Sequence, residues 1–190
     1  MYVNMILMKN YKKGELAKEI LTSLAAGALV VAFVAMPGLT KIAPLFMPKS
    51  ARERQRLSQS LRALKRKKLV DIYTKNGNEV VEITNEGKKK ILEYNLDEMK
   101  LKVPQKWDGW WRIVIFDVPE SKKIARDAIS RKIKELGLYP IQKSVFVSPY
   151  LCKNEIDFIG EFFGVRDHII YIKAKEIEGV RELKERFGIS

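Results

Sequence analysis

An apolar run near the start of the chain constrains the fold more than any other feature of this sequence. No charged residue lies between Glu19 and Lys41, and residues 20–36 are apolar around the whole circumference of a helix. A helix of this kind must be surrounded by protein or by lipid, because water would otherwise meet apolar side chains on every side. The run therefore has to be buried somewhere.

The length of the run favours burial in protein over burial in a membrane. A membrane span needs roughly 20 predominantly apolar residues, whereas this run has about 17 before Pro37. We therefore expect residues 20–36 to form a helix buried in the protein or across a dimer. A membrane helix, and with it a membrane-tethered regulator, stays open as an alternative. A signal peptide fits less well, because the apolar region starts late and lacks a clear small-x-small cleavage site.

Basic residues are concentrated in one segment, residues 49–68. The chain of 190 residues carries a formal charge of +13, and this segment holds nine Lys or Arg against one acid, Glu53. A surplus of this size favours a polyanionic partner, such as nucleic acid or an anionic membrane surface. We expect the partner to bind at this segment.

The chain contains one cysteine, Cys152, and one histidine, His168. This composition excludes a disulfide framework and a Cys/His zinc site, and it fits the reducing cytosol. We therefore expect a cytoplasmic protein without a cofactor, and we interpret the Cys152/His168 pair as accidental.

The pattern after Pro48 predicts a winged helix-turn-helix. Ser50 can cap a basic helix whose apolar seam is Leu57, Leu61 and Leu64. Two short strands, 69–73 and 80–84, flank Asn76-Gly77, a dipeptide typical of tight hairpin turns. A helix over residues 85–96 follows, with Thr84 or Asn85 as its cap.

The polar face of the basic helix is the expected DNA-binding surface. Arginine and glutamine side chains reach guanine and adenine edges in the major groove, and the other polar groups hold phosphates. The hairpin tip is expected to touch the adjacent backbone or the minor groove. The candidate DNA-binding residues are Arg52, Arg54, Gln55, Ser58, Gln59, Arg62, Lys75, Asn76 and Asn78.

A polar segment, residues 99–108, predicts a linker between two domains, 1–98 and 109–190. Beyond it the pattern is strand, helix, one or two strands, helix, strand, with a short terminal helix. Ser121 is the expected cap of the first of these helices. This order is that of a ferredoxin-like βαββαβ domain, so the expected fold class is α+β.

Two stretches of the second domain carry a family resemblance. "RIVIFDVPE" and "RDAISRKIKELGLYPIQKSVFVSPY" resemble the central domain of the phenylacetate-operon repressor (PaaX) family. They are also similar to the small CRISPR-adaptation endoribonuclease, the second Cas subunit. The resemblance spans roughly residues 107–175, and its signature residues are Trp110, Asp117, Gln142, Ser144 and Phe146. It implies a winged helix joined to a ferredoxin-like domain that pairs as a homodimer, and it leaves any small-molecule effector unidentified.

Asp117 carries the alternative interpretation. The nuclease resemblance implies that this strand-end aspartate, facing its counterpart in a second subunit, would hold Mg²⁺ or Mn²⁺. A single carboxylate in each chain is a small ligand set, and strand-end aspartates are common turn residues. We therefore expect a homodimeric, sequence-specific DNA-binding transcriptional repressor without catalytic residues or metal, and a metal-dependent endonuclease stays open as the alternative.

Overall fold

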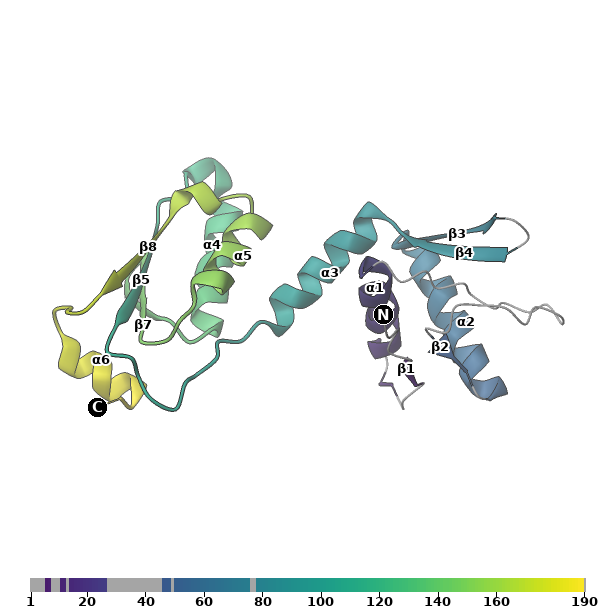
Figure 1. Cartoon of the computed structure of the whole chain (residues 1–190). Coiled ribbons are helices and arrows are strands. Elements are labelled where there is room, and N and C mark those ends of the chain that lie inside the picture. Colours follow the sequence, from purple (N-terminus) through teal and green to yellow (C-terminus); the bar gives the residue numbers. More distant parts are fainter. Residues whose placement is uncertain are drawn as a thin grey trace. The chain divides into compact units, whose positions relative to one another are not determined.

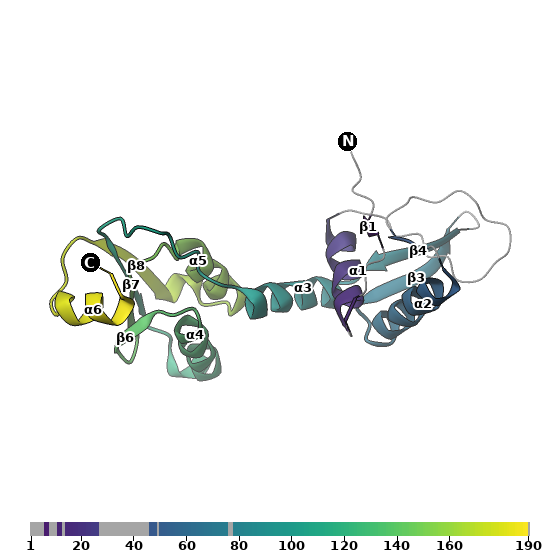
Figure 2. The same ribbon diagram turned by 90° about the horizontal axis from the view of Figure 1, so that it is seen from below.

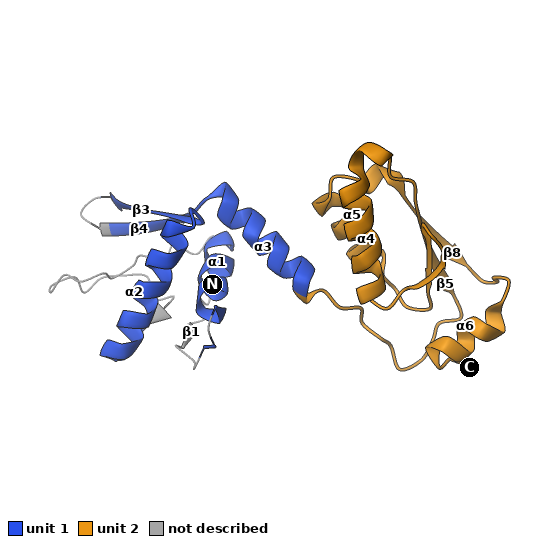
Figure 3. Ribbon diagram, turned by 180° about the vertical axis from the view of Figure 1, so that it is seen from behind, with its two compact units in different colours: residues 1–97 blue, residues 98–190 orange. Residues whose placement is uncertain are grey.

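The computed structural model describes residues 6–7, 11–12, 14–26, 46–48, 50–75 and 78–189. The chain divides into two compact units, residues 1–97 and residues 98–190 (Figure 3). The fold combines helices and sheets in both units, which confirms the expected α+β class.

Unit 1 contains helices and short strands in the order expected for a winged helix (Figure 1). Its elements are β1 (Ile6–Leu7), α1 (Glu15–Ala25), β2 (Phe46–Met47), α2 (Ala51–Arg66), β3 (Val70–Lys75), β4 (Asn78–Ile83) and α3 (Asn85–Glu98). Strands β1 and β2 pair in parallel, and β3 and β4 form an antiparallel hairpin. The basic segment thus folds as α2, directly before the hairpin, as predicted.

The start of the apolar run lies in α1, which begins five residues earlier than expected. Ile20, Leu21 and Leu24 are buried, whereas Thr22 and Ala25 are exposed, so this part of the run has a solvent-facing side. The rest of the run, residues 27–36, lies outside the described residues. Within the described ranges, no helix is both long and apolar enough to cross a membrane.

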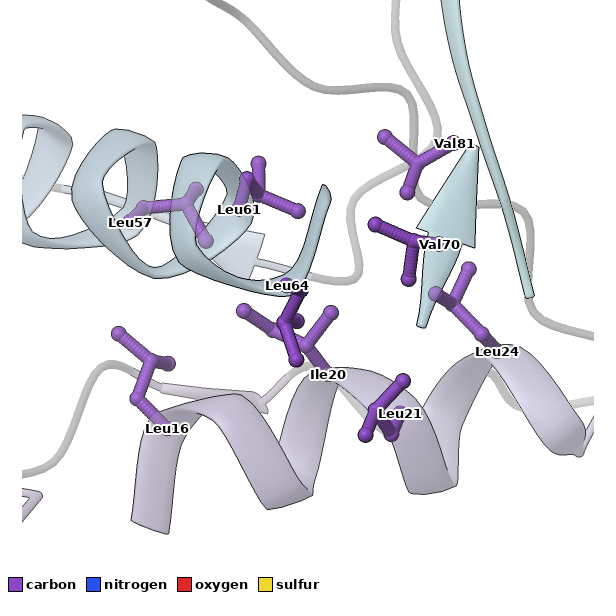
Figure 4. Close-up of a cluster of buried hydrophobic side chains, with 9 residues drawn as sticks. All are labelled: Leu16, Ile20, Leu21, Leu24, Leu57, Leu61, Leu64, Val70 and Val81. Atoms are coloured by element: carbon purple, nitrogen blue, oxygen red, sulfur yellow. The ribbon is translucent and has the colours of Figure 1, made fainter. Parts of the chain in front are cut away.

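The core of unit 1 forms where α1 and α2 pack against the hairpin (Figure 4). Leu57, Leu61 and Leu64 recur at helical spacing and are all buried, as the sequence predicts. The core residues are Leu16, Ile20, Leu21, Leu24, Leu57, Leu61, Leu64, Val70 and Val81. Ser50 caps α2, because its hydroxyl accepts a hydrogen bond from the backbone N–H of Glu53 at 3.2 Å. The seam and the cap together fix which face of α2 meets solvent.

Thr84 joins the hairpin to α3. Its hydroxyl accepts a hydrogen bond from the backbone N–H of Gly87 at 3.0 Å and donates one to the carbonyl of Lys68 at 2.7 Å. Gly87 packs so closely that a Cβ atom there would lie 2.1 Å from the carbonyl oxygen of Leu69. Of the two caps the sequence allowed, Thr84 is the one used, and only glycine fits at position 87.

Unit 2 contains a four-stranded antiparallel sheet in the order β6-β7-β5-β8. Its elements are β5 (Trp111–Phe116), a 3₁₀ turn (Glu120–Lys122), α4 (Lys123–Glu135), β6 (Tyr139–Gln142), β7 (Val145–Ser148), α5 (Lys153–Phe162), a second 3₁₀ turn (Arg166–His168), β8 (Ile169–Ala174) and α6 (Val180–Phe187). This element order and strand order are those of a ferredoxin-like domain.

The two faces of this sheet have different neighbours. Helices α4 and α5 lie together on one face (Figure 2), the face on which Val114 and Phe116 are buried. Leu183 of α6 packs against Trp111 and Val147 on the other face. The β5 side chains therefore alternate between two apolar layers, as a central strand requires.

The expected cap at Ser121 is wrong. Pro119 precedes a 3₁₀ turn that contains Ser121, and α4 begins only at Lys123, without a side-chain cap. The apolar face of α4 is nonetheless regular, with Ile129, Ile133 and the following Leu136 buried at helical spacing. A proline-initiated turn, which the spacing of apolar residues does not reveal, delays the start of this helix.

Candidate nucleic-acid interface

The exposed face of α2 presents an ordered stripe of basic and amide side chains. Arg52, Gln55, Gln59 and Arg62 follow one another at intervals of three or four residues, and all are exposed. At 100° per residue they lie on the side of the helix opposite the buried leucine seam. Packing of the seam therefore turns this stripe, hereafter the α2 stripe, toward solvent.

Arg66 extends the α2 stripe by one more turn. It is exposed and lies four residues beyond Arg62 on the same face. The sequence analysis did not include it among the DNA-binding candidates, because it belongs to a run of cations that also stabilises the helix C-terminus. Its spacing of four residues from Arg62 is the sequence signal that could have placed it on the same face.

The arginines of α2 are not neutralised by carboxylates. Within the described ranges, Arg52, Arg54, Arg62 and Arg66 take part in no ion pair. An unpaired arginine keeps all its N–H donors available for phosphate or base acceptors. The basic charge of this face is therefore available to a partner.

Two other cations of α2 have structural roles instead. Arg56 is partly buried and donates a hydrogen bond to the carbonyl of Tyr11 at 2.6 Å, which ties α2 to the segment before α1. Lys65 donates to the carbonyl of Ile72 at 3.4 Å. These contacts separate cations that hold unit 1 together from those that face solvent.

Arg54 and Ser58 lie at the flank of the α2 stripe. Arg54 is exposed and Ser58 is half-buried, and both are closer around the helix to the leucine seam than Gln59 is. A DNA duplex centred on the α2 stripe would contact Gln59 before it contacts Arg54 or Ser58. We expect the two flank residues to contribute less than the central ones.

The hairpin contributes charge of both signs. Lys75 is exposed and lies opposite Asn78 in the last residue pair before the tip of the hairpin. Near the base of the hairpin, Asp71 lies opposite Glu82. Tyr73 donates a hydrogen bond to Glu82 at 3.2 Å. Asn76 lies outside the described residues, and Asn78 is described for its backbone alone. Asp71 and Glu82 disfavour contact between the base of the hairpin and a polyanion.

Signature residues of unit 2 support the sheet. Phe146 is fully buried and stacks on Phe116, with ring centroids 5.6 Å apart, and the carbonyl of Ser144 accepts from the N–H of Phe116 at 3.0 Å. The ammonium groups of Lys173 and Lys175, at the end of β8, lie over the ring of Trp110. Gln142 is exposed at the end of β6. Phe146 therefore has a packing explanation, whereas Gln142 and Asp117 face solvent.

Asp117 directly follows β5 and is exposed. Its backbone N–H donates to the carbonyl of His168 at 3.0 Å, so the fold brings the backbone of the single histidine next to the strand-end aspartate. The sequence analysis missed this neighbour, because 51 positions separate the two residues. Within the described ranges, no group of three or more His, Cys, Asp or Glu side chains could hold a metal ion.

Polar groups are also buried inside unit 2. The guanidinium of Arg112, only 1% exposed, pairs with Asp108 and donates to the carbonyls of Trp110 and Pro149. The hydrogen bond from Arg112 holds the pKa of Asp108 below its ordinary value. Burial raises the pKa of the Cys152 thiol to about 11, which keeps this cysteine protonated and unreactive.

Comparison with known proteins finds a family match within the second unit. Residues 104–185 match the family model described as the PaaX protein central Cas2-like domain, which confirms the resemblance expected from the sequence. No curated protein matches the chain. The matched residues include all four strands of the sheet together with α4 and α5.

Proposed function

From the PaaX-type central domain that the chain carries, we propose that this protein is a transcriptional repressor that binds double-stranded DNA through the α2 stripe. The domain supports a PaaX-like regulator at the level of the family. The observation that supports DNA as the partner is the set of unpaired arginines opposite a buried seam. Phosphate contacts by such arginines supply affinity, and the glutamines between them can read base edges.

The dimensions of α2 fit the role of a recognition helix. Its 16 residues span about 24 Å at 1.5 Å per residue, and the major groove is about 12 Å wide and admits one helix. Gln55 and Gln59 lie between Arg52 and Arg62, so base-reading amides are flanked by phosphate-binding cations. This arrangement is the one that a specific DNA contact needs.

A single winged helix contacts only a few base pairs, so we propose that two copies bind paired half-sites as a homodimer. The ferredoxin-like unit is the proposed dimerisation module. This proposal predicts an operator with two-fold symmetry and centres of half-sites separated by whole helical turns, about 34–36 Å or its multiples.

A metal-dependent endonuclease is the second candidate function. The Cas2-like character of unit 2 and the exposure of Asp117, directly after β5, favour it. In that case Asp117 would bind Mg²⁺ or Mn²⁺ together with substrate phosphate. Nuclease activity would then disappear in Asp117→Ala.

One titration separates the two functions. Purified protein is added to labelled duplex from its own promoter region in the presence of Mg²⁺, and the products are run on native and denaturing gels. A shifted, intact duplex that outcompetes random DNA supports the repressor. Cut strands that disappear with EDTA and in Asp117→Ala would overturn it in favour of the nuclease.

A further inference from the structure

A cavity of about 510 Å³ lies in unit 2, between residues 102–112 and residues 149–155. This volume falls within the ~300–1,000 Å³ range of small-molecule sites. None of the candidate DNA-binding residues lines it. Val103 and Leu151 line it and are 65% and 67% exposed, so the cavity offers apolar surface to a ligand.

The wall of the cavity includes a buried cation. Arg112 lines the cavity, and its side chain is 1% exposed. Its two terminal nitrogens are engaged by Asp108 and by backbone carbonyls. Arg112 is therefore a structural part of this wall, held in place by its partners inside unit 2.

The N-terminal end of α5 lies at the same cavity. Lys153, Asn154 and Glu155 form its first turn and line the wall, and Cys152 at the cap position supplies no side-chain acceptor. The first amides of a helix have no partner within the helix, and the helix dipole adds a partial positive charge. Such an end favours an anion.

The charges around the cavity have the same preference. Lys102 and Lys106 line it, are exposed, and form no ion pair with any described residue. Lys153 is engaged by Asp157 at 2.5 Å, and Asp108 is neutralised by Arg112. Glu155 is the one carboxylate of the wall that is not engaged in an ion pair among the described residues, and it opposes an anion. The unpaired charges therefore favour an anion by two lysines to one glutamate.

We propose that this cavity binds a small amphipathic organic anion. Its carboxylate or phosphate head lies against Lys102, Lys106 and the first turn of α5, and its aliphatic or aromatic body lies on Val103 and Leu151. This inference goes beyond the proposed DNA-binding function and does not depend on it.

The tryptophans provide the readout. All three tryptophans of the chain, Trp107, Trp110 and Trp111, lie within or beside the segment that forms one wall. Full-length protein without DNA is titrated with octanoate, octyl phosphate and octanol, and the emission is recorded. We expect saturable changes with at least one of the two anions and none with octanol over the same concentrations. The preferred head group distinguishes a carboxylate from a phosphate ligand.

Variants test the assignment of the walls. Lys102→Gln combined with Lys106→Gln should weaken binding about tenfold, whereas Glu155→Gln should tighten it about threefold, because each removes one sign of charge. The matched control, Lys134→Gln with Lys143→Gln, makes the same charge change at exposed residues away from the cavity and should leave the affinity unaltered.

Three results would overturn the inference: no saturable binding of either anion, equal binding of octanol, or equal losses in the two lysine pairs. Because no DNA is present, such a failure leaves the repressor proposal intact. Conversely, a protein that binds anions and ignores its promoter would refute the repressor and retain the cavity.

Discussion

The two units use their basic residues in different ways. Residues 1–97 contain 18 Lys and Arg against 9 Asp and Glu, and residues 98–190 contain 18 against 14. The arginines of the α2 stripe are exposed and form no ion pair with any residue that the structure describes, whereas Arg112, Arg126 and Arg166 of unit 2 are bound by carboxylates. Cations that are already paired contribute little to long-range attraction. This difference is the reason why unit 1 is the proposed nucleic-acid-binding unit, whereas several cations of unit 2 stabilise its fold.

The largest expected effect is the loss of DNA binding when the α2 stripe is reversed in charge. Arg52→Glu combined with Arg62→Glu should weaken binding on the order of 100-fold or more, because two phosphate contacts become repulsive. Fluorescence anisotropy with labelled duplex measures it. The control, Lys88→Glu with Lys134→Glu, makes the same charge change at exposed lysines elsewhere. Equal losses in both pairs would show that only net charge matters.

Arg112→Met tests whether a paired arginine of unit 2 stabilises the fold of that unit. It removes a buried guanidinium with contacts to Asp108 and two carbonyls, and we expect unit 2 to lose about 2–4 kcal/mol of unfolding free energy. Urea unfolding followed by tryptophan emission measures this unit, since all tryptophans lie in it. The control Lys143→Met, at an exposed site, should change little. A normal unfolding curve for Arg112→Met would contradict the structural role.

Cys152 predicts how unit 2 responds to alkali. Burial raises its pKa from an ordinary value of 9.0 to about 11, so the folded state favours the protonated thiol. As the pH rises, the Cys152 thiol ionises in the unfolded chain before it does so in the folded protein, which favours unfolding. The protonated thiol therefore contributes about 2–3 kcal/mol to the free energy of unfolding below pH 9, and this contribution is lost between pH 9 and 11. Urea unfolding at pH 8 and pH 10.5 measures the loss. It should be smaller in Cys152→Ala, and an equal loss in that variant would assign the effect to other groups.

Smaller effects separate base readers from phosphate contacts in unit 1. Gln59→Ala should cost about 1–3 kcal/mol on the specific duplex and little on random DNA, and Arg54→Ala, at the flank, should cost less. Lys75→Ala should weaken both duplexes alike and reduce the salt slope by about 1. Competition assays at several salt concentrations measure these differences. Equal losses on both duplexes for all three variants would remove the assignment of base readers.

Local patterns in the sequence predict much of the fold. The leucine seam, the Ser50 cap and the strand-helix alternation after residue 110 identify α2 and the ferredoxin-like sheet, because each depends on residues within a turn or two of one another. The polar face of α2 follows from the same seam. Its candidate DNA-binding role stays a prediction.

Features that depend on distant residues are not visible in the sequence. Arg56 reads as one more surface cation until α2 meets the carbonyl of Tyr11, 45 positions away. Arg112 reads as a polar interruption of an apolar strand, although its partners bury it almost completely. The anion cavity requires residues 102–112 and 149–155 to meet. Only the tertiary structure brings these groups together.

The central claim, that DNA lies on α2, is tested most directly by placing a DNA-cleaving group on that helix. An iron chelate is attached through Ser58→Cys, or through Lys143→Cys in unit 2, since the native Cys152 is buried and does not compete for the label. With promoter duplex, we predict strand cleavage clustered at the half-sites from position 58 and none from position 143. Cleavage from position 143 alone would place the DNA on unit 2 and contradict the account.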